Sequence, residues 1–572
     1  MVRRKQATTM NAADALVDTL ARAGVEKVFG VIGTSTLDIA DAINREQGLE
    51  FVSAREEEAA AHMADGYARA TGRVGVVLAH VGPGALRLMY GVGTAWKDSV
   101  PMVVLTGNEV LAATDTEMRE GYHVIPVEEL YRPITKGTLQ LSRPEDARRM
   151  VGRAFWLARS GRPGPVLIDL PKSTLKLPFD GPDIPTTSIG DRVPASPVVV
   201  SAENLARVAD LIKTSSNPVL LAGAGVHWSN AHDALRSVAE QLNLPILTTD
   251  GGRGAIPEDH ALSLGVIGRQ AGDAVARALL EESDVVIALG TPLSDVSTYE
   301  WTAWPNDTTL VQVDISPDVG HRGYSPHHLV VADIEKFLVG LGQTFEKLRY
   351  RCAHDWQSRR IALDEERRGY LREGDDRAAS DLVNPWVIID ELTDSLPRDS
   401  FISVDSGMHG FFGKKLRVLE PRTYVRSAGF GAMGYSFPGV LGALESDPDR
   451  HGVAIVGDGC LAMELGEFET AARRGSSITV IVFNDSRFAS QQSHQLRRLD
   501  GRIIGTDFHV TDFVKIAEAQ GVPGWTVTDD DAARKAIREA MVSKGPTVID
   551  ARVDPEVRPS TWIEGSGDQR LR

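Results

Sequence analysis

Two runs in the C-terminal third of the chain decide the fold: GVAIVGDG at residues 452–459 and ITVIVFND at residues 478–485. Each begins with apolar, largely β-branched residues, which are typical of a buried strand. Strands buried on both faces belong to parallel sheets that are covered by helices. Ligands bind such sheets at the carboxyl ends of the strands, so Asp458 and Asp485 are expected at a binding edge.

The same alternation of apolar runs and helix-period stretches extends along the 572 residues. Asn11, for example, is expected to cap a helix that ends at Gly24, before a strand at residues 28–29. The pattern predicts an α/β protein of three doubly wound parallel-sheet domains in series. The expected domains are an N-terminal one at 1–185, a middle one at 195–345 and a C-terminal one at 375–572.

The two end domains share a short motif, GPVLID at 164–169 and GPTVID at 545–550. Each is expected to form a strand that closes its domain, which hints that the end domains are related. The proline-rich stretch at 171–197 and the charged, loosely periodic stretch at 347–381 are interpreted as linkers.

Composition narrows the class of protein. The chain has 62 Lys and Arg against 78 Asp and Glu, a net charge of −16, so binding to nucleic acid is not expected. No apolar run approaches the ~18 residues of a membrane helix, and no secretory signal is evident, so we expect a cytoplasmic protein. With only Cys352 and Cys460 present, any metal is expected to have oxygen ligands.

The GDG run at 457–459 has a chemical reading of its own. The glycines let the backbone come close to a diphosphate, and a carboxylate is a suitable ligand for Mg²⁺. Alone the motif is weak evidence, because Gly and Asp also fill ordinary turns.

GDG at 457–459 followed by Asn484-Asp485 resembles the signature of thiamin-diphosphate (ThDP) enzymes, in particular the acetolactate synthase-like enzymes of the pyruvate oxidase, decarboxylase and carboligase superfamily. The resemblance implies that Asp458, Asp485 and the backbone carbonyl of Arg487 bind Mg²⁺. It also implies that Gly457, Gly459 and Cys460 contact the cofactor. Asp485 departs from the family, which usually has asparagine there, and adds negative charge to the site.

Two further segments look like parts of the ThDP site. SAGFGAMGYSFP at 427–438 is similar to the family's GxMGxxxP segment, which implies that Met433 wedges the cofactor into a bent shape and that the Gly431 carbonyl accepts a hydrogen bond from its aminopyrimidine. The turn at 405–409 resembles the family's phosphate-side turn and implies that His409 donates to the diphosphate. Outside the resemblance, Met433 is explained as core filler and His409 as a plain loop histidine.

The candidate for proton chemistry lies in REEEAAAHMADGYAR at 55–69. Acids are common at helix N-termini for dipole reasons alone, so the three glutamates are unremarkable by themselves. The stretch is similar to the family's R-H-E-x-x-A-x-x-A-x-G-Y-A-R frame, which selects Glu57 as the acid beside the aminopyrimidine. In the family this glutamate and the diphosphate site come from different subunits, which implies a homodimer or homotetramer with active sites at the subunit interface.

Three positions differ from acetolactate synthase itself. His123 stands where that enzyme has Gln, Ser490 where it has Met and His494 where it has Trp. We expect His123 and His494 to face a polar pocket and to act on a carboxylate, hydroxyl or other charged group of the substrate. The alternative is that one or both histidines point away from the pocket.

Taken together, the resemblance implies a ThDP- and Mg²⁺-dependent enzyme that makes or breaks a C–C bond in a small carbonyl substrate, by decarboxylation or carboligation of a 2-keto acid. The alternative is a lyase of a 2-hydroxy ketone or a 2-hydroxyacyl thioester. The turn Gly223-Ala224-Gly225 lacks the third glycine of a dinucleotide fingerprint, so FAD is not favoured and an NAD dehydrogenase is a weaker reading. A further alternative is a non-catalytic paralogue, and the presence of Glu57, Asp458 and Met433 argues against it.

Overall fold

The computed structural model describes residues 10–109, 115–185, 198–270, 272–372 and 380–560. The chain forms two compact units: unit 1 comprises residues 1–196 and 441–446, and unit 2 comprises residues 197–440 and 447–572. Unit 1 holds one sheet and unit 2 holds two, and every strand pair in all three sheets is parallel. The predicted class of three parallel-sheet α/β domains is confirmed.

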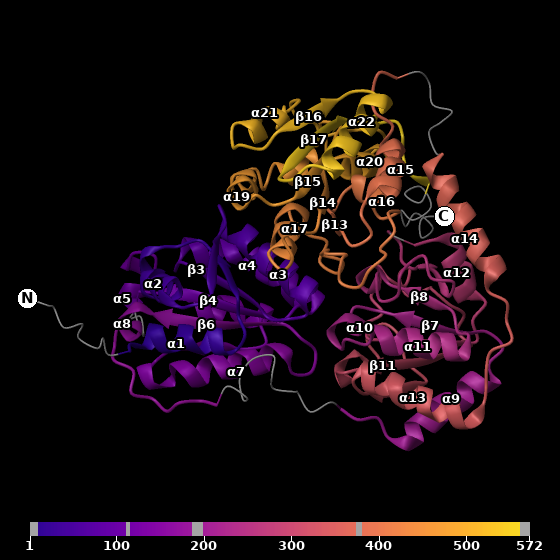
Figure 1. Ribbon diagram of the computed structural model, residues 1–572, viewed down its shortest axis with the longest axis horizontal. Helices are drawn as coiled ribbons and strands as arrows, with labels where there is room; N and C mark the ends of the chain where they lie inside the picture. Colours follow the sequence, from indigo (N-terminus) through magenta and orange to yellow (C-terminus); the bar gives the residue numbers. More distant parts are fainter. Residues whose placement is uncertain (1–9, 110–114, 186–197, 271, 373–379, 561–572) are drawn as a thin grey trace, which may run out of the picture. The chain divides into compact units, whose positions relative to one another are not determined.

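Unit 1 is built on a six-stranded sheet with the order β2-β1-β3-β4-β6-β5. Figure 1 labels β3, β4 and β6 of this sheet. Asn11 caps the first helix as predicted, since its side chain accepts from the Asp14 N–H at 2.8 Å. The Asp14 carboxylate accepts from the Asn11 N–H, which completes a capping box. The strands are β1 (Lys27–Gly30), β2 (Glu50–Ser53), β3 (Gly75–Ala79), β4 (Met102–Asn108), β5 (Thr138–Gln140) and β6 (Pro165–Pro171). The helices are α1 (Ala12–Arg22), α2 (Leu37–Arg45), α3 (Glu57–Thr71), α4 (Pro83–Asp98), α5 (Asp115–Glu120), α6 (Val127–Tyr131), α7 (Ala147–Arg159) and α8 (Lys172–Leu175).

The first sheet of unit 2 has the order β12-β11-β10-β7-β8-β9. Its strands are β7 (Pro218–Ala222), β8 (Ile246–Thr248), β9 (Ser263–Val266), β10 (Val285–Leu289), β11 (Thr309–Asp314) and β12 (His328–Val331). Its helices are α9 (Ala202–Thr214), α10 (Gly225–Trp228), α11 (His232–Leu242), α12 (Ala274–Glu281) and α13 (Ile334–Leu348). One continuous apolar core fills the space between this sheet and its helices.

The second sheet of unit 2 has the order β13-β14-β15-β17-β16. Its strands are β13 (Phe401–Val404), β14 (Gly452–Gly457), β15 (Ile478–Asn484), β16 (Gly524–Val527) and β17 (Thr547–Arg552). The helices of this part are α15 (Pro385–Ser395), α16 (His409–Gly413), α18 (Asp458–Leu461), α19 (Glu467–Arg474), α20 (Ala489–Arg498), α21 (Phe513–Glu518) and α22 (Asp530–Met541). Helix α17 (Ser436–Leu444) begins in unit 2, and its residues from Leu441 belong to unit 1.

The two copies of the GPxxID motif occupy matching places. One lies in β6 and the other in β17, and each strand is next to last in its sheet, beside a short edge strand that precedes it in the chain. The shared motif therefore marks equivalent strands of two similarly built sheets.

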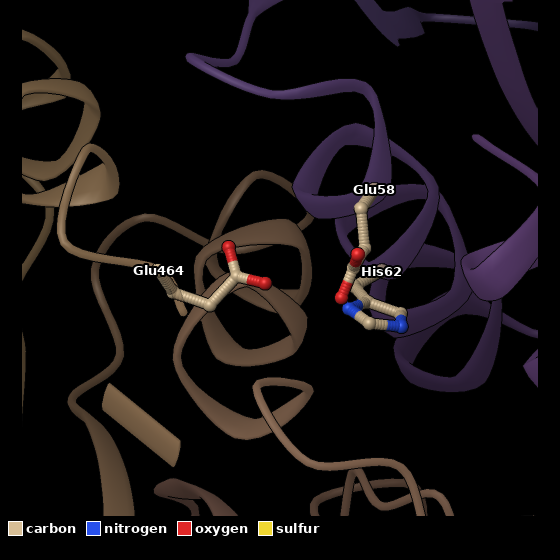
Figure 2. A group of neighbouring side chains, drawn as sticks. All are labelled: Glu58, His62 and Glu464. Atoms are coloured by element: carbon tan, nitrogen blue, oxygen red, sulfur yellow. The ribbon is translucent and has the colours of Figure 1, made fainter. Parts of the chain in front are cut away.

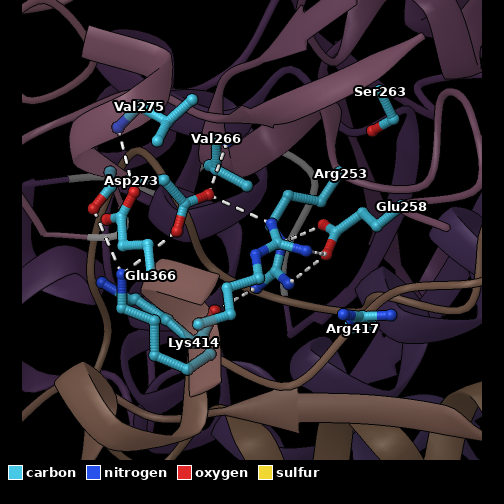
Figure 3. Close-up of polar contacts among 12 residues, drawn as sticks. Arg253, Glu258, Ser263, Val266, Asp273, Val275, Glu366, Lys414 and Arg417 are labelled. Carbon is cyan, nitrogen blue, oxygen red and sulfur yellow. Dashed lines mark hydrogen bonds and ion pairs between the residues drawn. The ribbon is translucent and has the colours of Figure 1, made fainter. Parts of the chain in front are cut away.

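The predicted linker at 347–381 is wrong over residues 357–371, where α14 (Gln357–Leu371) lies. The Glu366 carboxylate accepts from the backbone N–H groups of Ala274 and Val275, at 2.7 and 2.9 Å, at the start of α12 (Figure 3). Buried Arg367 pairs with buried Asp273 at 3.0 Å. The helix thus packs through charged side chains that have partners, and an apolar periodicity does not reveal such a face.

The other predicted linker, 171–197, begins with the end of β6 and with α8, and its residues 186–197 lie outside the described part of the chain. Among the described residues, no helix is long and apolar enough to cross a lipid bilayer.

Candidate functional site

A cavity of about 650 Å³ lies in unit 2 where four neighbouring strands end. The segments that follow β13, β14, β15 and β17 all line it, as do Gly431 and Met433 from the loop before α17. Arg269, Gln270, Val296 and Glu300 line it from the other sheet of unit 2. Ligands of open α/β sheets bind at this edge, so the cavity is the candidate site.

Asp458, directly after β14, is a buried carboxylate with one unsatisfied oxygen. Its Oδ1 accepts from the Gly459 N–H at 2.7 Å, whereas its Oδ2 has no hydrogen-bond partner among the described residues. Burial, with a further contribution from Asp485, raises the pKa of Asp458 to about 7. Two carboxylates and an unpaired oxygen in one cavity form a donor set that suits a divalent cation.

Asp485 carries the extra charge relative to the asparagine of the family, and Arg487 neutralises it. The Arg487 Nε donates to Asp485 Oδ2 at 2.9 Å, and its two Nη atoms donate to the Gln492 Oε1 and the Pro555 carbonyl, each at 2.9 Å. Burial raises the pKa of Asp485 and the guanidinium opposes that shift. Asp458, Asp485 and Arg487 all line the cavity, as the predicted metal set requires.

His409 opens α16 and lies between two glycines. A Cβ atom at Gly457 would lie 2.7 Å from its Nδ1, and one at Gly407 would lie 2.5 Å from its Cε1, so larger residues at these positions would displace the ring. Burial lowers the pKa of His409 to about 3, which keeps the ring neutral. Its Nε2 is buried without a protein partner, as expected of a group reserved for a ligand.

The loop that carries Met433 is fixed by backbone contacts. Gly431 and Gly434 have φ angles of +69° and +79°, in the left-handed region that favours glycine. The Gly434 N–H donates to Asp405 Oδ2 at 2.9 Å, which ties the loop to the end of β13. Gly431 and Met433 both line the cavity, where the predicted cofactor contacts require them.

Gly459 and Cys460, the remaining predicted cofactor contacts, also line the cavity. Cys460 donates through its Sγ to the Ser406 carbonyl at 3.2 Å. Burial raises the pKa of the Cys460 thiol, so this cysteine is a packed, protonated group rather than a nucleophile.

Helix α20 contributes a polar stripe to the cavity wall. Ser490, His494 and Arg498 are spaced four residues apart, which places them on one face of the helix, and all three line the cavity. Arg558, which follows β17, lines it too and donates to Ser493 Oγ at 3.4 Å. The structure therefore brings His494 together with the metal and cofactor candidates.

In unit 1, Glu57 is the first residue of α3 and lies against Gly84. A Cβ atom at Gly84 would lie 2.8 Å from the Glu57 Oε1, so glycine makes room for this carboxylate. The Arg87 Nε is 4.0 Å from Glu57 Oε2, while Arg87 pairs more closely with Glu56.

The neighbouring Glu58 lies beside His62, one turn further along α3 (Figure 2). Burial raises the pKa of Glu58 to about 7, and burial lowers the pKa of His62 to about 3. Environment alone therefore favours Glu58 as an acid, whereas the sequence frame selects Glu57. The choice between them is a prediction that mutagenesis decides.

His123 lies in unit 1, where its Nδ1 is 2.9 Å from the Nε2 of His80. His80 in turn contacts Ser35, with 2.7 Å between Nδ1 and Oγ. The sequence analysis missed Ser35 and His80. The available signal was position, because His80 directly follows β3 and Ser35 lies beyond the end of the adjacent β1.

The turn Gly223-Ala224-Gly225 serves strand packing. A Cβ atom at Gly223 would lie 2.5 Å from the Gly290 carbonyl oxygen, and one at Gly225 would lie 2.6 Å from the Gly290 Cα. Both glycines thus allow the ends of β7 and β10 to approach closely, which explains them without a nucleotide.

Comparison with known proteins gives matches along most of the chain. Three family models match: the thiamine pyrophosphate enzyme N-terminal TPP binding domain at 10–125, the central domain at 205–341 and the C-terminal TPP binding domain at 405–551. The chain is 33% identical over 559 residues to the acetolactate synthase large subunit of Parasynechococcus marenigrum, covering 95% of this chain and 88% of the relative. It is 31% identical over 546 residues to the acetolactate synthase isozyme 3 large subunit of Escherichia coli, covering 93% and 92%. The acetolactate synthase large subunit of Corynebacterium glutamicum is 31% identical over 561 residues, covering 96% and 88%.

Proposed function

Because the chain belongs to the thiamin-diphosphate-dependent enzyme family of the acetolactate synthases, we propose that it acts with Mg²⁺ on a 2-keto acid, by decarboxylation and carboligation. The observation that carries the proposal is the buried, unpartnered Oδ2 of Asp458 beside Asp485 at the sheet edge. A buried carboxylate oxygen left without a partner costs free energy, and a bound cation would remove that cost.

The residues of the cavity fit the cofactor and its metal. Asp458, Asp485 and the Arg487 carbonyl would hold Mg²⁺, and His409 would contact the diphosphate side of the cofactor through its Nε2. Met433 and the Gly431 carbonyl would hold the cofactor's rings. When bound, ThDP supplies the nucleophilic carbon and the electron sink, and the protein supplies binding, orientation and exclusion of water.

Glu57 is proposed as the acid that exchanges a proton with the aminopyrimidine of ThDP. A positioned carboxylic acid at this point is what general acid–base catalysis requires. Glu57 belongs to unit 1 and the metal set to unit 2. As in the family, we propose that the active unit is a homodimer or a homotetramer, with each site formed by two subunits.

The substrate is proposed to be polar or anionic beyond its keto group. Ser490, His494 and Arg498 present a hydroxyl, an imidazole and a guanidinium to the cavity, and Arg558 adds a second guanidinium. A guanidinium binds a carboxylate with two parallel hydrogen bonds, so this wall favours a negatively charged group on the substrate.

The test is incubation of the purified protein with ThDP, Mg²⁺ and a panel of 2-keto acids and 2-hydroxy ketones, with products identified by mass. Release of CO₂ from a 2-keto acid, with an aldehyde or a ligated product, is the expected result. Cleavage of 2-hydroxy ketones alone would replace the proposal by the lyase reading. No product from any carbonyl compound, with ThDP bound, would indicate a non-catalytic paralogue.

A further inference from the structure

Three side chains of unit 1 form a continuous hydrogen-bonded chain, Ser35 to His80 to His123. The Ser35 Oγ is 2.7 Å from His80 Nδ1, and His80 Nε2 is 2.9 Å from His123 Nδ1. The chain lies beyond the carboxyl ends of β1 and β3, which are adjacent strands of the sheet. This is the edge at which parallel sheets bind ligands.

The donor and the acceptor of each hydrogen bond follow from the contacts of Ser35. The Val81 N–H donates to the Ser35 Oγ at 3.2 Å, and His80 Nδ1, 2.7 Å from this Oγ, is available as the acceptor of the Ser35 hydroxyl hydrogen. The backbone N–H of Ser35 also points to His80 Nδ1, at 3.3 Å. A nitrogen that faces two donors is an acceptor, so the neutral His80 carries its hydrogen on Nε2.

The hydrogen bond between His80 and His123 then determines the tautomer of His123. Because His80 Nε2–H donates to His123 Nδ1, the neutral His123 carries its hydrogen on Nε2. Burial, with His123 as the second cause, lowers the pKa of His80. The other charged groups that act on His80 are Glu109 and Lys172, which oppose each other and are themselves an ion pair.

The backbone is shaped to accommodate the chain. A Cβ atom at Gly33 would lie 2.4 Å from a ring carbon of His80, and one at Gly82 would lie 2.6 Å from the His123 carbonyl oxygen. His123 itself has a φ of +63°, in the left-handed region that is unfavourable for residues other than glycine. Such a conformation persists because the surrounding structure enforces it.

The hydrogen-bonded residues also lie next to Glu57, the proposed proton donor. A Cβ atom at Gly84 would lie 2.8 Å from Glu57 Oε1 and 3.3 Å from the Cβ of His80. Glu57 and the start of the His80 side chain therefore flank the same glycine. The hydrogen-bonded chain is thus placed beside the residue to which the chemistry is assigned.

We propose that Ser35 and His80 are positioning residues that hold His123 as a neutral donor, whose Nε2–H binds a carboxylate or carbonyl oxygen of the 2-keto acid. This inference rests on the proposed function, and its alternative is that His123 transfers a proton to or from the substrate. No bond to hydrogen is broken, so His123 polarises and orients the substrate without changing its own charge.

The kinetic test uses a pair of substitutions at His123. Glutamine keeps an N–H donor but does not titrate, whereas leucine offers neither. If His123 is a neutral donor, His123→Gln should retain kcat/KM within about threefold and His123→Leu should lose about tenfold or more. If it transfers a proton, the two variants should be equally impaired, which would overturn the proposal. Unchanged ThDP affinity in both shows that the site is intact.

The positioning role is tested by a double-mutant cycle with Ser35→Ala. This change should lower kcat/KM about threefold to tenfold in the wild-type background, because His80 Nδ1 keeps only the longer hydrogen bond from the backbone N–H of residue 35 and its tautomer is held less firmly. In the His123→Gln background it should have little effect, because glutamine does not depend on that tautomer. Equal losses in both backgrounds would mean that Ser35 acts only through stability.

A second readout is independent of turnover: ¹⁵N NMR of the histidine-labelled holoenzyme, with the His123 signals assigned from the His123→Gln variant. The expected spectrum has His123 protonated at Nε2 and unprotonated at Nδ1 at neutral pH. The opposite tautomer, or an imidazolium, would contradict the inferred hydrogen-bond roles of Ser35, His80 and His123. If no 2-keto acid is turned over but this spectrum is found, the proposed function fails and the tautomer assignment stands.

Discussion

The hydrogen-bonded residues Ser35, His80 and His123 of unit 1 and the cavity around Asp458 in unit 2 each lie at the carboxyl ends of the strands of their own sheet. The polar groups of the two regions nevertheless find their partners in different ways. In unit 1, each internal link from Ser35 to His80 to His123 is made by protein atoms. In unit 2, the Asp458 Oδ2 and the His409 Nε2 are buried without protein partners. The polar groups of the first region pair with one another, whereas the second region leaves buried polar atoms for the proposed metal and cofactor.

This difference assigns the two regions different tasks. Groups that orient a substrate must be held in place by the protein, because geometry errors cost rate. Groups proposed to bind a cation and a diphosphate can lack protein partners, because a bound ligand would supply them. Substitutions in unit 1 should therefore affect rate, and substitutions at the metal set should affect cofactor binding.

The largest effect that sharpens this comparison is expected at Glu57. Glu57→Gln should slow turnover by on the order of 10²–10⁴, the usual loss for a missing acid–base group, and should leave ThDP affinity unchanged. Glu58→Gln is the matched control, since Glu58 is the neighbour whose pKa burial raises to about 7. Steady-state kinetics beside calorimetric ThDP titrations provide the measurement, and a larger loss in the control would move the catalytic assignment to Glu58.

A smaller effect is expected at His494, which lies in the unit 2 region but is proposed to contact the substrate rather than the cofactor. His494→Ala should lower kcat/KM about tenfold, equivalent to about 1.4 kcal/mol of transition-state stabilisation, without weakening ThDP. His509→Ala is the control, because His509 is exposed and does not line the cavity. Near wild-type kinetics in His494→Ala would remove the polar wall from the account of substrate choice.

The smallest effect is one of stability. The folded-state pKa of Asp458, about 7, lies above its ordinary value of 3.8, so folding favours the protonated form. The apoprotein therefore loses stability at this site as the pH rises from about 4 to about 7. Asp458→Asn should raise the melting temperature of the apoprotein by a few degrees at pH 8, and by less at pH 5. Exposed Asp500→Asn serves as the control, and a lower melting temperature for Asp458→Asn at pH 8 would contradict the buried-charge argument.

Local pattern predicted the fold, because strand and helix periods and the turns after them are short-range properties. Asp458, Asp485, His409, Met433 and His494 were predicted from different segments, and the structure places them around one cavity. Parallel topology explains this convergence, since successive strands end at the same edge. The roles of these residues stay predictions, as do the domain boundaries and the subunit arrangement.

Local pattern failed where side chains find distant partners. Helix α14 was interpreted as part of a linker because Arg367 and Glu366 do not mark a buried face, although each has its partner near the start of α12. The contact from Ser35 to His80 spans 45 residues, and no spacing rule connects them. Long-range polar pairing of this kind is evident only once the sheet order is known.

The most direct test of the central claim is calorimetric titration of ThDP into the wild-type protein and into Asp458→Ala, with Mg²⁺ and with a chelator, and with exposed Asp500→Ala as the control. The account predicts binding to the wild type and to the control only when Mg²⁺ is present. It predicts a loss of about 100-fold or more for Asp458→Ala, because a metal ligand is removed from an incomplete shell. Undiminished ThDP affinity in Asp458→Ala, or equal affinity with and without Mg²⁺, would contradict it.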